Sequence, residues 1–231
     1  MPVFSFNGGE GVGKTTVINE IKAILENNGV DVAVYQAFGT PIGGHVRKMI
    51  KTGSFKSNLQ KAILKFAALV DTWSEIQADL KENPKRVILL DRDFLSFAAY
   101  DMFIDQNYAA VDLIEEMQGH LGEQKMIPDI SFTLVCPDDI VAERLAVRKV
   151  RVASKETAER YFNLPEDSLE VPEVDVMDEN FRNINPFVVQ GIMFKHEFLT
   201  KKHYVLDSSC PSNDLALDII SLMGADDAAV H

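Results

Sequence analysis

A glycine-rich stretch near the start of the chain has the residue types needed to bind a phosphate chain. Residues 8–15 read GGEGVGKT and match the spacing G-x-x-x-x-G-K-T. Glycines allow successive backbone N–H groups to turn inward around phosphate oxygens, and a following helix adds partial positive charge at its first turn. We therefore predict a phosphate-binding loop that binds a nucleoside triphosphate through Gly8, Glu10, Gly11, Val12, Gly13, Lys14, Thr15 and Thr16.

Two side chains of this loop have specific chemistry. The Lys14 ammonium reaches the β and γ phosphates in such loops, and the Thr15 hydroxyl is a ligand for Mg²⁺. A nucleoside triphosphate and Mg²⁺ are accordingly the expected ligands of the loop. The motif does not define the class of enzyme. Neither D-x-x-G nor N-K-x-D occurs in the chain, which argues against a GTPase switch protein.

A second cluster of charged residues follows an apolar run, in the segment VILLDRDFLSFAAYD at 87–101. The predicted strand ends at Asp91 and Arg92, which places both side chains at the carboxyl edge of a sheet, where open α/β folds bind ligands. Asp91 is a candidate to hold Mg²⁺ through water, together with Thr15. Arg92 is a candidate to bind a second phosphate group through its forked guanidinium.

These residues are carried by elements that alternate along the chain. Apolar, β-branched runs alternate with segments of helical period, the pattern of an α/β protein with a parallel sheet. Val17 and Ile21 lie on one face of a predicted helix that stops at Gly29, and the longest helical segment spans about 57–81 before Asn-Pro. We predict one domain over 1–231, with strands at 3–6, 31–35, 86–90, 130–135 and 203–206.

Charge and composition limit the classes of partner and the cellular location that we expect. The net charge of −12 argues against binding of duplex nucleic acid or an anionic membrane, which both require clustered Lys and Arg. No leader-like or membrane-spanning apolar run is visible, so we expect a cytoplasmic protein. Cys136 and Cys210 are far apart and lack metal-ligand spacing. Residues 165–180 hold seven acids and no Lys or Arg, which indicates an irregular excursion inside the domain.

The two motifs together resemble the thymidylate kinase family. FNGGEGVGKTT is similar to the acid-containing phosphate loop of that family, and DRDFLSFAAYD to its Asp-Arg-aromatic-x-x-Ser-x-x-Ala-Tyr motif. GTPIGGHVRKMI at 39–50 and PDISFTLVCPDDIVAERLAVRK at 128–149 resemble further family segments in the same order. The resemblance implies a three-layer P-loop kinase fold with a five-stranded parallel sheet and a lid insertion, which would lie with the acidic excursion at about 149–180. It also implies a homodimer.

The resemblance also implies roles for individual positions. Arg92 would bind the phosphate of the acceptor nucleotide, and Phe66 would stack on its base. Arginines of a lid would act at or near the transferred group, and a loop that starts at Asp207 would contact the adenine of ATP. By position, the catalytic residues would be Lys14, Arg92, Arg148 and Arg151, with Arg144 and Asp207 at the donor nucleotide and Glu10, Arg47, Phe66, Val70, Arg92, Ser96 and Tyr100 at the acceptor.

Several of these positions have a structural alternative. Phe66 belongs to a helical stripe with Ile63, Val70 and Trp73, and such stripes usually form core. Arg144, Arg148 and Arg151, at or near the implied lid, recur at helical spacing among acids, as on a solvated helix face. Glu10 fits a turn, and Arg47 fits the surface of a helix. The sequence leaves these alternatives open.

Three positions depart from the family pattern. Val70 stands where an arginine reads the edge of thymine, Asp93 stands where an aromatic residue follows the Asp-Arg pair, and Asp101 stands where a glutamine is usual. Replacement of a buried arginine by valine removes a hydrogen-bond donor to the base, and such donors set specificity. The sequence therefore does not identify the nucleobase.

The leading hypothesis is reversible transfer of the γ-phosphate of ATP to a deoxynucleoside monophosphate, most specifically dTMP to dTDP. An ionised phosphate acceptor needs alignment and charge neutralisation more than a general base. A second hypothesis is a deoxynucleoside or modified-nucleotide kinase, in which Asp93 or Asp101 would take the proton of a hydroxyl acceptor. A third is a nucleotide-binding module without catalysis.

Overall fold

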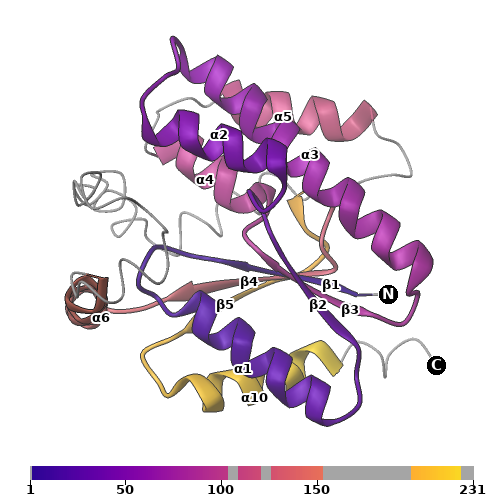
Figure 1. The fold of residues 1–231 in the computed structure, drawn as a ribbon, viewed down its shortest axis with the longest axis vertical. Coiled ribbons are helices and arrows are strands. Elements are labelled where there is room, and N and C mark those ends of the chain that lie inside the picture. The colour runs from indigo at the N-terminus through magenta and orange to yellow at the C-terminus, as the bar shows by residue number, and fades with distance from the viewer. Residues whose placement is uncertain (1, 104–108, 121–125, 153–198, 225–231) are drawn as a thin grey trace, which may run out of the picture.

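The computed structural model describes residues 2–103, 109–120, 126–152 and 199–224. Its centre is a sheet of five parallel strands in the order β2-β3-β1-β4-β5 (Figure 1). All five predicted strands are confirmed, with ends that differ from the prediction by one residue at most. The strands are β1 (Val3–Asn7), β2 (Val32–Gln36), β3 (Val87–Asp91), β4 (Ile130–Val135) and β5 (His203–Asp207).

Helices cover both faces of the sheet and complete the three-layer α/β fold. Figure 1 shows α2, α3, α4 and α5 on one face and α1 with α10 on the other. The predicted lid and acidic excursion lie mostly outside the described residues, which resume at Leu199. The helices are α1 (Lys14–Asn27), α2 (Pro41–Lys51), α3 (Asn58–Glu82), α4 (Phe94–Phe103), α5 (Ala109–His120), α6 (Asp138–Val152) and α10 (Ser212–Gly224).

Local sequence sets several helix ends. The Thr40 hydroxyl accepts a hydrogen bond from the Gly43 N–H at 3.0 Å, and Pro41 occupies the first helical position of α2. Ser57 caps α3 in the same way, accepting from the Gln60 N–H at 3.1 Å. Gly29 has a φ of 80° after α1, the left-handed conformation that its predicted stop position requires.

The core consists of two layers because neighbouring strand residues point to opposite faces. Phe4, Phe6 and Leu89 pack against α1 and α10. Ile88 and Leu90 point the other way and pack against the face covered by α3 and α4. A parallel sheet buried on both faces explains why these strands are almost continuously apolar.

The strand order brings two chain segments together at the carboxyl edge of the sheet. β1 lies between β3 and β4, and Phe6 of β1 is in register with Asp91 of β3. The chain leaves β1 into the glycine-rich loop and leaves β3 at Arg92. Because the connections from these two strands run to opposite sides of the sheet, this is the position where open α/β folds bind ligands.

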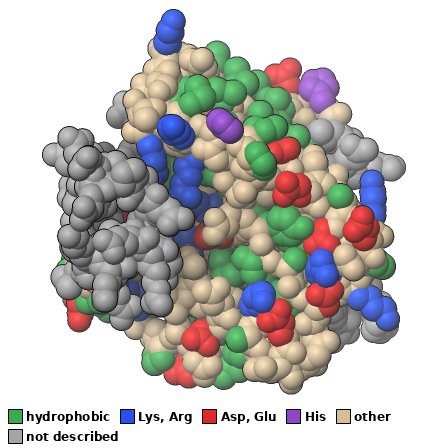
Figure 2. Space-filling model, in the orientation of Figure 1, with side chains coloured by type: hydrophobic (Ala, Val, Ile, Leu, Met, Phe, Trp, Pro, Cys, Tyr) green, Lys and Arg blue, Asp and Glu red, His purple; other side chains and the backbone are tan. Residues whose placement is uncertain are grey.

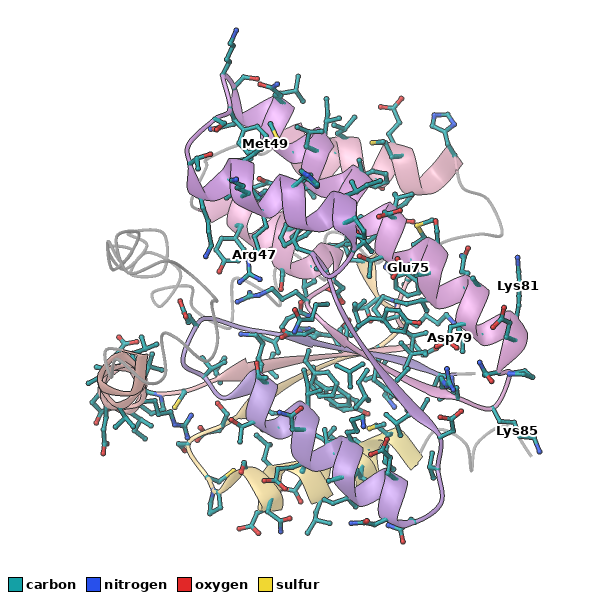
Figure 3. All side chains as sticks on the ribbon, in the orientation of Figure 1. Arg47, Met49, Glu75, Asp79, Lys81 and Lys85 are labelled. Carbon is teal, nitrogen blue, oxygen red and sulfur yellow. The ribbon has the colours of Figure 1, made fainter. Side chains whose placement is uncertain are left out.

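A polar cluster anchors the C-terminal part of α3 away from this edge. Asp79 accepts hydrogen bonds from Tyr35 Oη at 2.9 Å and from Arg86 Nη1 at 2.6 Å, and Arg86 Nε donates to Asp31 at 2.9 Å. Burial raises the pKa of Tyr35 to about 12. Figure 3 shows Asp79 on the opposite side of the molecule from Arg47, so this cluster positions α3 without reaching the loop edge.

Candidate active site

The glycine-rich loop joins β1 to α1 with a backbone that favours glycine at three positions. Gly8, Gly11 and Gly13 have φ values of 131°, 79° and 99°. A Cβ atom on Gly8 would lie 2.4 Å from the Leu134 carbonyl oxygen, which is shorter than real Cβ contacts. The loop is therefore pressed against the end of β4, and its conformation depends on the absence of a side chain at Gly8.

Lys14 opens α1 and directs its ammonium into this loop. It is 7% exposed, and Nζ donates to the carbonyl oxygens of Gly8 at 2.9 Å and Gly9 at 2.6 Å. Thr15 and Thr16 follow as exposed residues in the first turn of α1, which contains no acidic side chain. The first turn therefore adds positive potential beside the ammonium group.

Arg92 approaches the same loop from β3. Its backbone N–H donates to the Phe6 carbonyl at 2.9 Å, and its Nη1 donates to the Gly8 carbonyl at 3.1 Å. Lys14 and Arg92 thus share one backbone oxygen as an acceptor, and the structure brings the two predicted phosphate-binding cations together. Arg92 also has a φ of 71°, a left-handed conformation that costs a bulky residue about 1 kcal/mol or more and that is typical of functional sites.

Ser96 and Tyr100, the two α4 residues predicted beside the acceptor, have different neighbours. The Arg92 guanidinium carbon is 5.6 Å from the centre of the Tyr100 ring, within the range of a cation–π contact. Ser96 is 2% exposed, and its hydroxyl donates to Asn7 Oδ1 at 2.6 Å. Tyr100 is therefore brought next to Arg92, whereas Ser96 is turned toward β1.

The surroundings of Asp91 fit its predicted role as a residue that holds Mg²⁺. Alternation along β3 places its side chain on the face of Phe6 and Leu89, which is the face that α1 covers. Its Oδ1 atom is buried and has no hydrogen-bond partner among the described residues. A buried carboxylate oxygen without a partner on the same face as Thr15 suits Mg²⁺, whose sites combine one or two protein ligands with water and phosphates.

Arg144 of α6 connects three segments at this edge. Its Nη1 donates to the Val12 carbonyl at 3.2 Å and contacts Cys136 Sγ at 3.5 Å, while Nη2 donates to the Ser208 carbonyl at 2.9 Å. The guanidinium thereby joins the phosphate loop to the loop after β5. That loop begins at Asp207, which is exposed and whose pKa is lowered by the backbone N–H of Ser209.

The remaining predicted residues occupy varied surroundings. Phe66 is 5% exposed, and its ring lies 5.1 Å from that of Phe94 within the core on the α3 face. Val70 is half-buried against the same core. Arg47 is exposed, and Figure 3 shows it on the side of α2 that faces the sheet. The partly exposed Glu10 lies within the loop turn.

The proposed lid arginines are only partly described. Arg148 and Arg151 belong to the last turns of α6, but their side chains lie outside the described residues. The same is true of the segment that follows Val152 up to Phe198. Figure 2 shows Lys and Arg side chains gathered near α2 on the face in view, and Figure 3, in the same orientation, shows Arg47 on that helix. This part of the surface is positive despite the negative net charge of the chain.

A buried polar network links Asp93 to the sheet. Its Oδ1 accepts from the Leu95 N–H at 2.8 Å, and its Oδ2 accepts from the hydroxyls of Ser5 and of Ser131, the latter at 3.0 Å. Complete burial raises the pKa of the Asp93 carboxyl, although the hydrogen bonds that it accepts oppose the rise. The sequence signal for this network was the serine and asparagine in VFSFN and the serine in ISFTLV, polar residues within buried strands.

Asp101, another of the three positions that depart from the family pattern, also has a buried partner. Lys65 of α3 donates to Asp101 Oδ1 at 2.5 Å, and the two side chains are 5% and 1% exposed. The Lys65 ammonium also lies 5.8 Å from the centre of the Phe97 ring. This buried ion pair joins α3 to α4, and removal of either partner would leave an uncompensated charge in the interior.

The glycine loop on a helix N-terminus, with two cations at one loop carbonyl, defines a P-loop phosphate-binding protein of the nucleotide kinase class. The sequence profile of the thymidylate kinase family matches residues 6–173. The chain therefore belongs to the thymidylate kinase family.

Individual relatives agree with this placement. A thymidylate kinase of Bartonella henselae is 31% identical over 173 residues, which is 73% of this chain and 76% of that protein. The thymidylate kinases of Campylobacter curvus and Campylobacter hominis are 31% and 32% identical over 134 and 127 residues. These alignments cover 56% and 55% of this chain but only 66% and 62% of the two Campylobacter proteins.

Substitution of Gly8 by alanine should disrupt the phosphate loop. Because a Cβ would collide with the Leu134 carbonyl and the left-handed φ disfavours a side chain, we expect Gly8→Ala to weaken ATP binding at least about tenfold. Gly44→Ala is the matched control, since a Cβ there meets nothing within 4 Å on α2. Calorimetric titration with ATP checks this, and equal affinity of the two variants would contradict the geometry described for the loop.

Proposed function

We propose that this protein is an ATP-dependent nucleoside monophosphate kinase that converts dTMP to dTDP. The observation that carries the proposal is the shared acceptor: Lys14 from the phosphate loop and Arg92 from the turn after β3 both donate to the Gly8 carbonyl oxygen. Two cations that converge on one point suit a reaction in which two phosphate groups must be brought into line. Membership of the thymidylate kinase family supports the nucleotide acceptor.

The reaction requires alignment and charge neutralisation more than proton transfer. The acceptor oxygen belongs to a phosphate that is already ionised near neutral pH, so the transferring group needs positive charge around it. Lys14 would bind the donor phosphates, and Arg92 would hold the acceptor phosphate opposite them. Because both side chains are held by backbone carbonyls, little reorganisation is needed when the phosphates bind.

Arg144 would support the donor side. Its guanidinium joins the Val12 carbonyl of the phosphate loop to the Ser208 carbonyl after β5, the loop proposed to contact adenine. Arg148 and Arg151 are proposed to add positive charge from the end of α6. Glu10, Arg47, Phe66, Val70, Ser96 and Tyr100 remain the proposed acceptor residues, with Tyr100 the best supported because it lies against Arg92.

The rival hypothesis of a hydroxyl acceptor is not favoured by the geometry. It needs a carboxylate that can take a proton from the acceptor. Asp93 is fully buried and accepts hydrogen bonds from Ser5, Ser131 and Leu95. Asp101 is 1% exposed and is paired with Lys65. Neither group is available at the surface of the phosphate site.

An acceptor panel tests the proposed reaction. Purified protein with ATP and Mg²⁺ should release ADP with deoxynucleoside monophosphates, fastest with dTMP, and not with nucleosides. Lys14→Ala should abolish turnover because residues 8–16 contain no other Lys or Arg to bind the donor phosphates. Arg92→Ala should lower kcat/KM for the acceptor about 30-fold, or roughly 2 kcal/mol, since a charge-assisted contact is lost.

The acceptor panel and the two variants together discriminate between the three hypotheses for the function. Lys14→Ala controls for contaminating kinases in the preparation. Near wild-type rates in either variant would overturn the assignment of these residues. Faster phosphorylation of nucleosides would favour the hydroxyl-acceptor hypothesis, and tight ATP binding without transfer to any acceptor would favour a non-catalytic module.

We also propose Mg²⁺ as the metal of the site, held by Thr15 and Asp91. The buried Oδ1 atom of Asp91 without a described partner supports this. Among the described residues, no three or more His, Cys, Asp or Glu side chains lie close enough together to hold a metal ion, and Mg²⁺ does not require such a cluster. When bound, the ion would neutralise charge on the donor phosphates.

Removal of the metal should stop the reaction. Chelation by EDTA should abolish ADP release, and added Mg²⁺ should restore it. Asp91→Asn should raise the Mg²⁺ concentration needed for half-maximal rate about tenfold, because a neutral amide is a poorer ligand than a carboxylate. Asp218→Asn, at an exposed position of α10, controls for the change of net charge. An unchanged Mg²⁺ dependence in Asp91→Asn would exclude this residue from the metal site.

We propose in addition that the chain forms a homodimer through α2 and α3 and acts in the cytoplasm. Ile42, Leu59 and Ile63 are 52%, 52% and 43% exposed on these two packed helices, an apolar surface that a second copy could cover. None of the described helices is long and apolar enough to cross a membrane. The cytoplasmic location stays a prediction from the sequence.

Sedimentation velocity measures the oligomeric state directly. Wild-type protein at micromolar concentration should sediment as a dimer, and Ile63→Asp should shift it to the monomer because a charge would be buried at the contact. Leu217→Asp, at a residue 50% exposed on α10, is the control and should remain dimeric. A monomeric wild type would contradict the proposal.

A further inference from the structure

We propose that Asp93 is a positioning residue for the phosphate site, which holds Arg92 against the strand that leads into the phosphate loop. Asp93 directly follows Arg92, and it stands where the family pattern has an aromatic residue. Its effect on turnover rests on the kinase activity proposed above. Its effect on the conformation of Arg92 does not.

The Asp93 carboxyl joins three elements. Through the Leu95 N–H it caps the start of α4, and through the hydroxyls of Ser5 and Ser131 it contacts β1 and β4. Ser5 and Ser131 are directly opposite in the parallel register of these strands, and their hydroxyl oxygens are 2.7 Å apart. All three side chains are fully buried. A carboxyl group anchored at three points cannot shift without breaking contacts that water would not replace.

The same network reaches the phosphate loop through Asn7. Asn7 Oδ1 accepts from the Ser96 hydroxyl at 2.6 Å and from the Asp93 N–H at 3.4 Å, and the next residue along the chain is Gly8. β1 therefore holds both sides of the turn at Arg92: the Phe6 carbonyl binds the Arg92 N–H, and Asn7 and Ser5 bind Asp93.

This arrangement explains how Arg92 keeps a left-handed backbone. A non-glycine residue stays in that conformation only where its surroundings over-determine it. Here Arg92 has a φ of 71°, and with this backbone its guanidinium donates to the Gly8 carbonyl. The network at Asp93 supplies the contacts on the far side of the turn, so loss of the carboxyl should let the guanidinium move away from the loop.

Steady-state kinetics of three variants test the proposal: Asp93→Ala, Asp93→Asn and Ser131→Ala. We expect Asp93→Ala and Ser131→Ala to lower kcat/KM for the acceptor about tenfold, with KM for ATP changed less than about twofold, because Arg92 is displaced while the P-loop lysine is retained. Asp93→Asn should recover part of the loss, since its amide oxygen still accepts from the Leu95 N–H. The fold of each variant is followed by circular dichroism and Tm.

Thr133→Val is the matched control. Thr133 is buried on the same face of the same strand as Ser131, but it bonds His203 at 2.8 Å, outside the network. Thr133→Val should lower Tm without a selective loss of kcat/KM for the acceptor. If Asp93→Ala and Ser131→Ala also lower only Tm, the network is structural and the proposal is wrong. If Asp93→Ala does not fold, Ser131→Ala decides the question.

A failure of the proposed kinase function can be distinguished from a failure of the positioning role of Asp93. If wild-type protein phosphorylates no acceptor, the proposed function fails, and the position of Arg92 is followed by the NMR signal of its Nε–H group, assigned through Arg92→Lys. A shifted or broadened signal in Asp93→Ala and Ser131→Ala, with no change in Thr133→Val, would support the positioning role. An unchanged signal in both test variants would overturn it.

Discussion

The carbonyl oxygen of Gly8 organises the site, because two cations from different parts of the chain donate to it. Lys14 and Arg92 would repel each other in the absence of a shared acceptor, and the backbone dipole holds both in place within the fold. The result is a concentrated positive field beside the first turn of α1. Such a field is worth more inside a protein than in water, because the local dielectric is lower and the groups are already oriented.

Parallel pairing of β1 with β3 makes this convergence possible. The register sets the end of β3 beside the end of β1, so that the residue after each strand lies at the same edge. Alternation of side chains then separates two tasks. Asp91 points toward α1 and the proposed metal, whereas Ser5 and Ser131 form the buried network on the α4 side. Strands β1, β3 and β4 thus support both the proposed metal position and the Arg92 turn, and the backbone strain falls on Arg92.

Membership of the thymidylate kinase family is compatible with a changed acceptor side. The phosphate loop keeps its glycines, lysine and threonine, but Val70 stands where the family pattern has an arginine, and its side chain packs against the core. The carboxylate at Asp101 is neutralised by Lys65 inside the protein. A buried ion pair is expensive to form and rigid once made. The proposed preference for dTMP therefore has to arise from contacts other than those that the family pattern supplies at these positions.

Sequence alone determined the five strands, the glycine loop and the position of Arg92 at the end of β3, because apolar periodicity and phosphate-binding spacing are local properties of the chain. It also showed that Phe66 and Val70 share a helical stripe, but not which neighbours they would meet. Tertiary structure decided the rest. That Arg92 and Lys14 share one oxygen, that Asp93 contacts Ser5 and Ser131, and that Lys65 neutralises Asp101 all join residues far apart in the chain. Such contacts depend on strand order and helix packing, which no local pattern encodes.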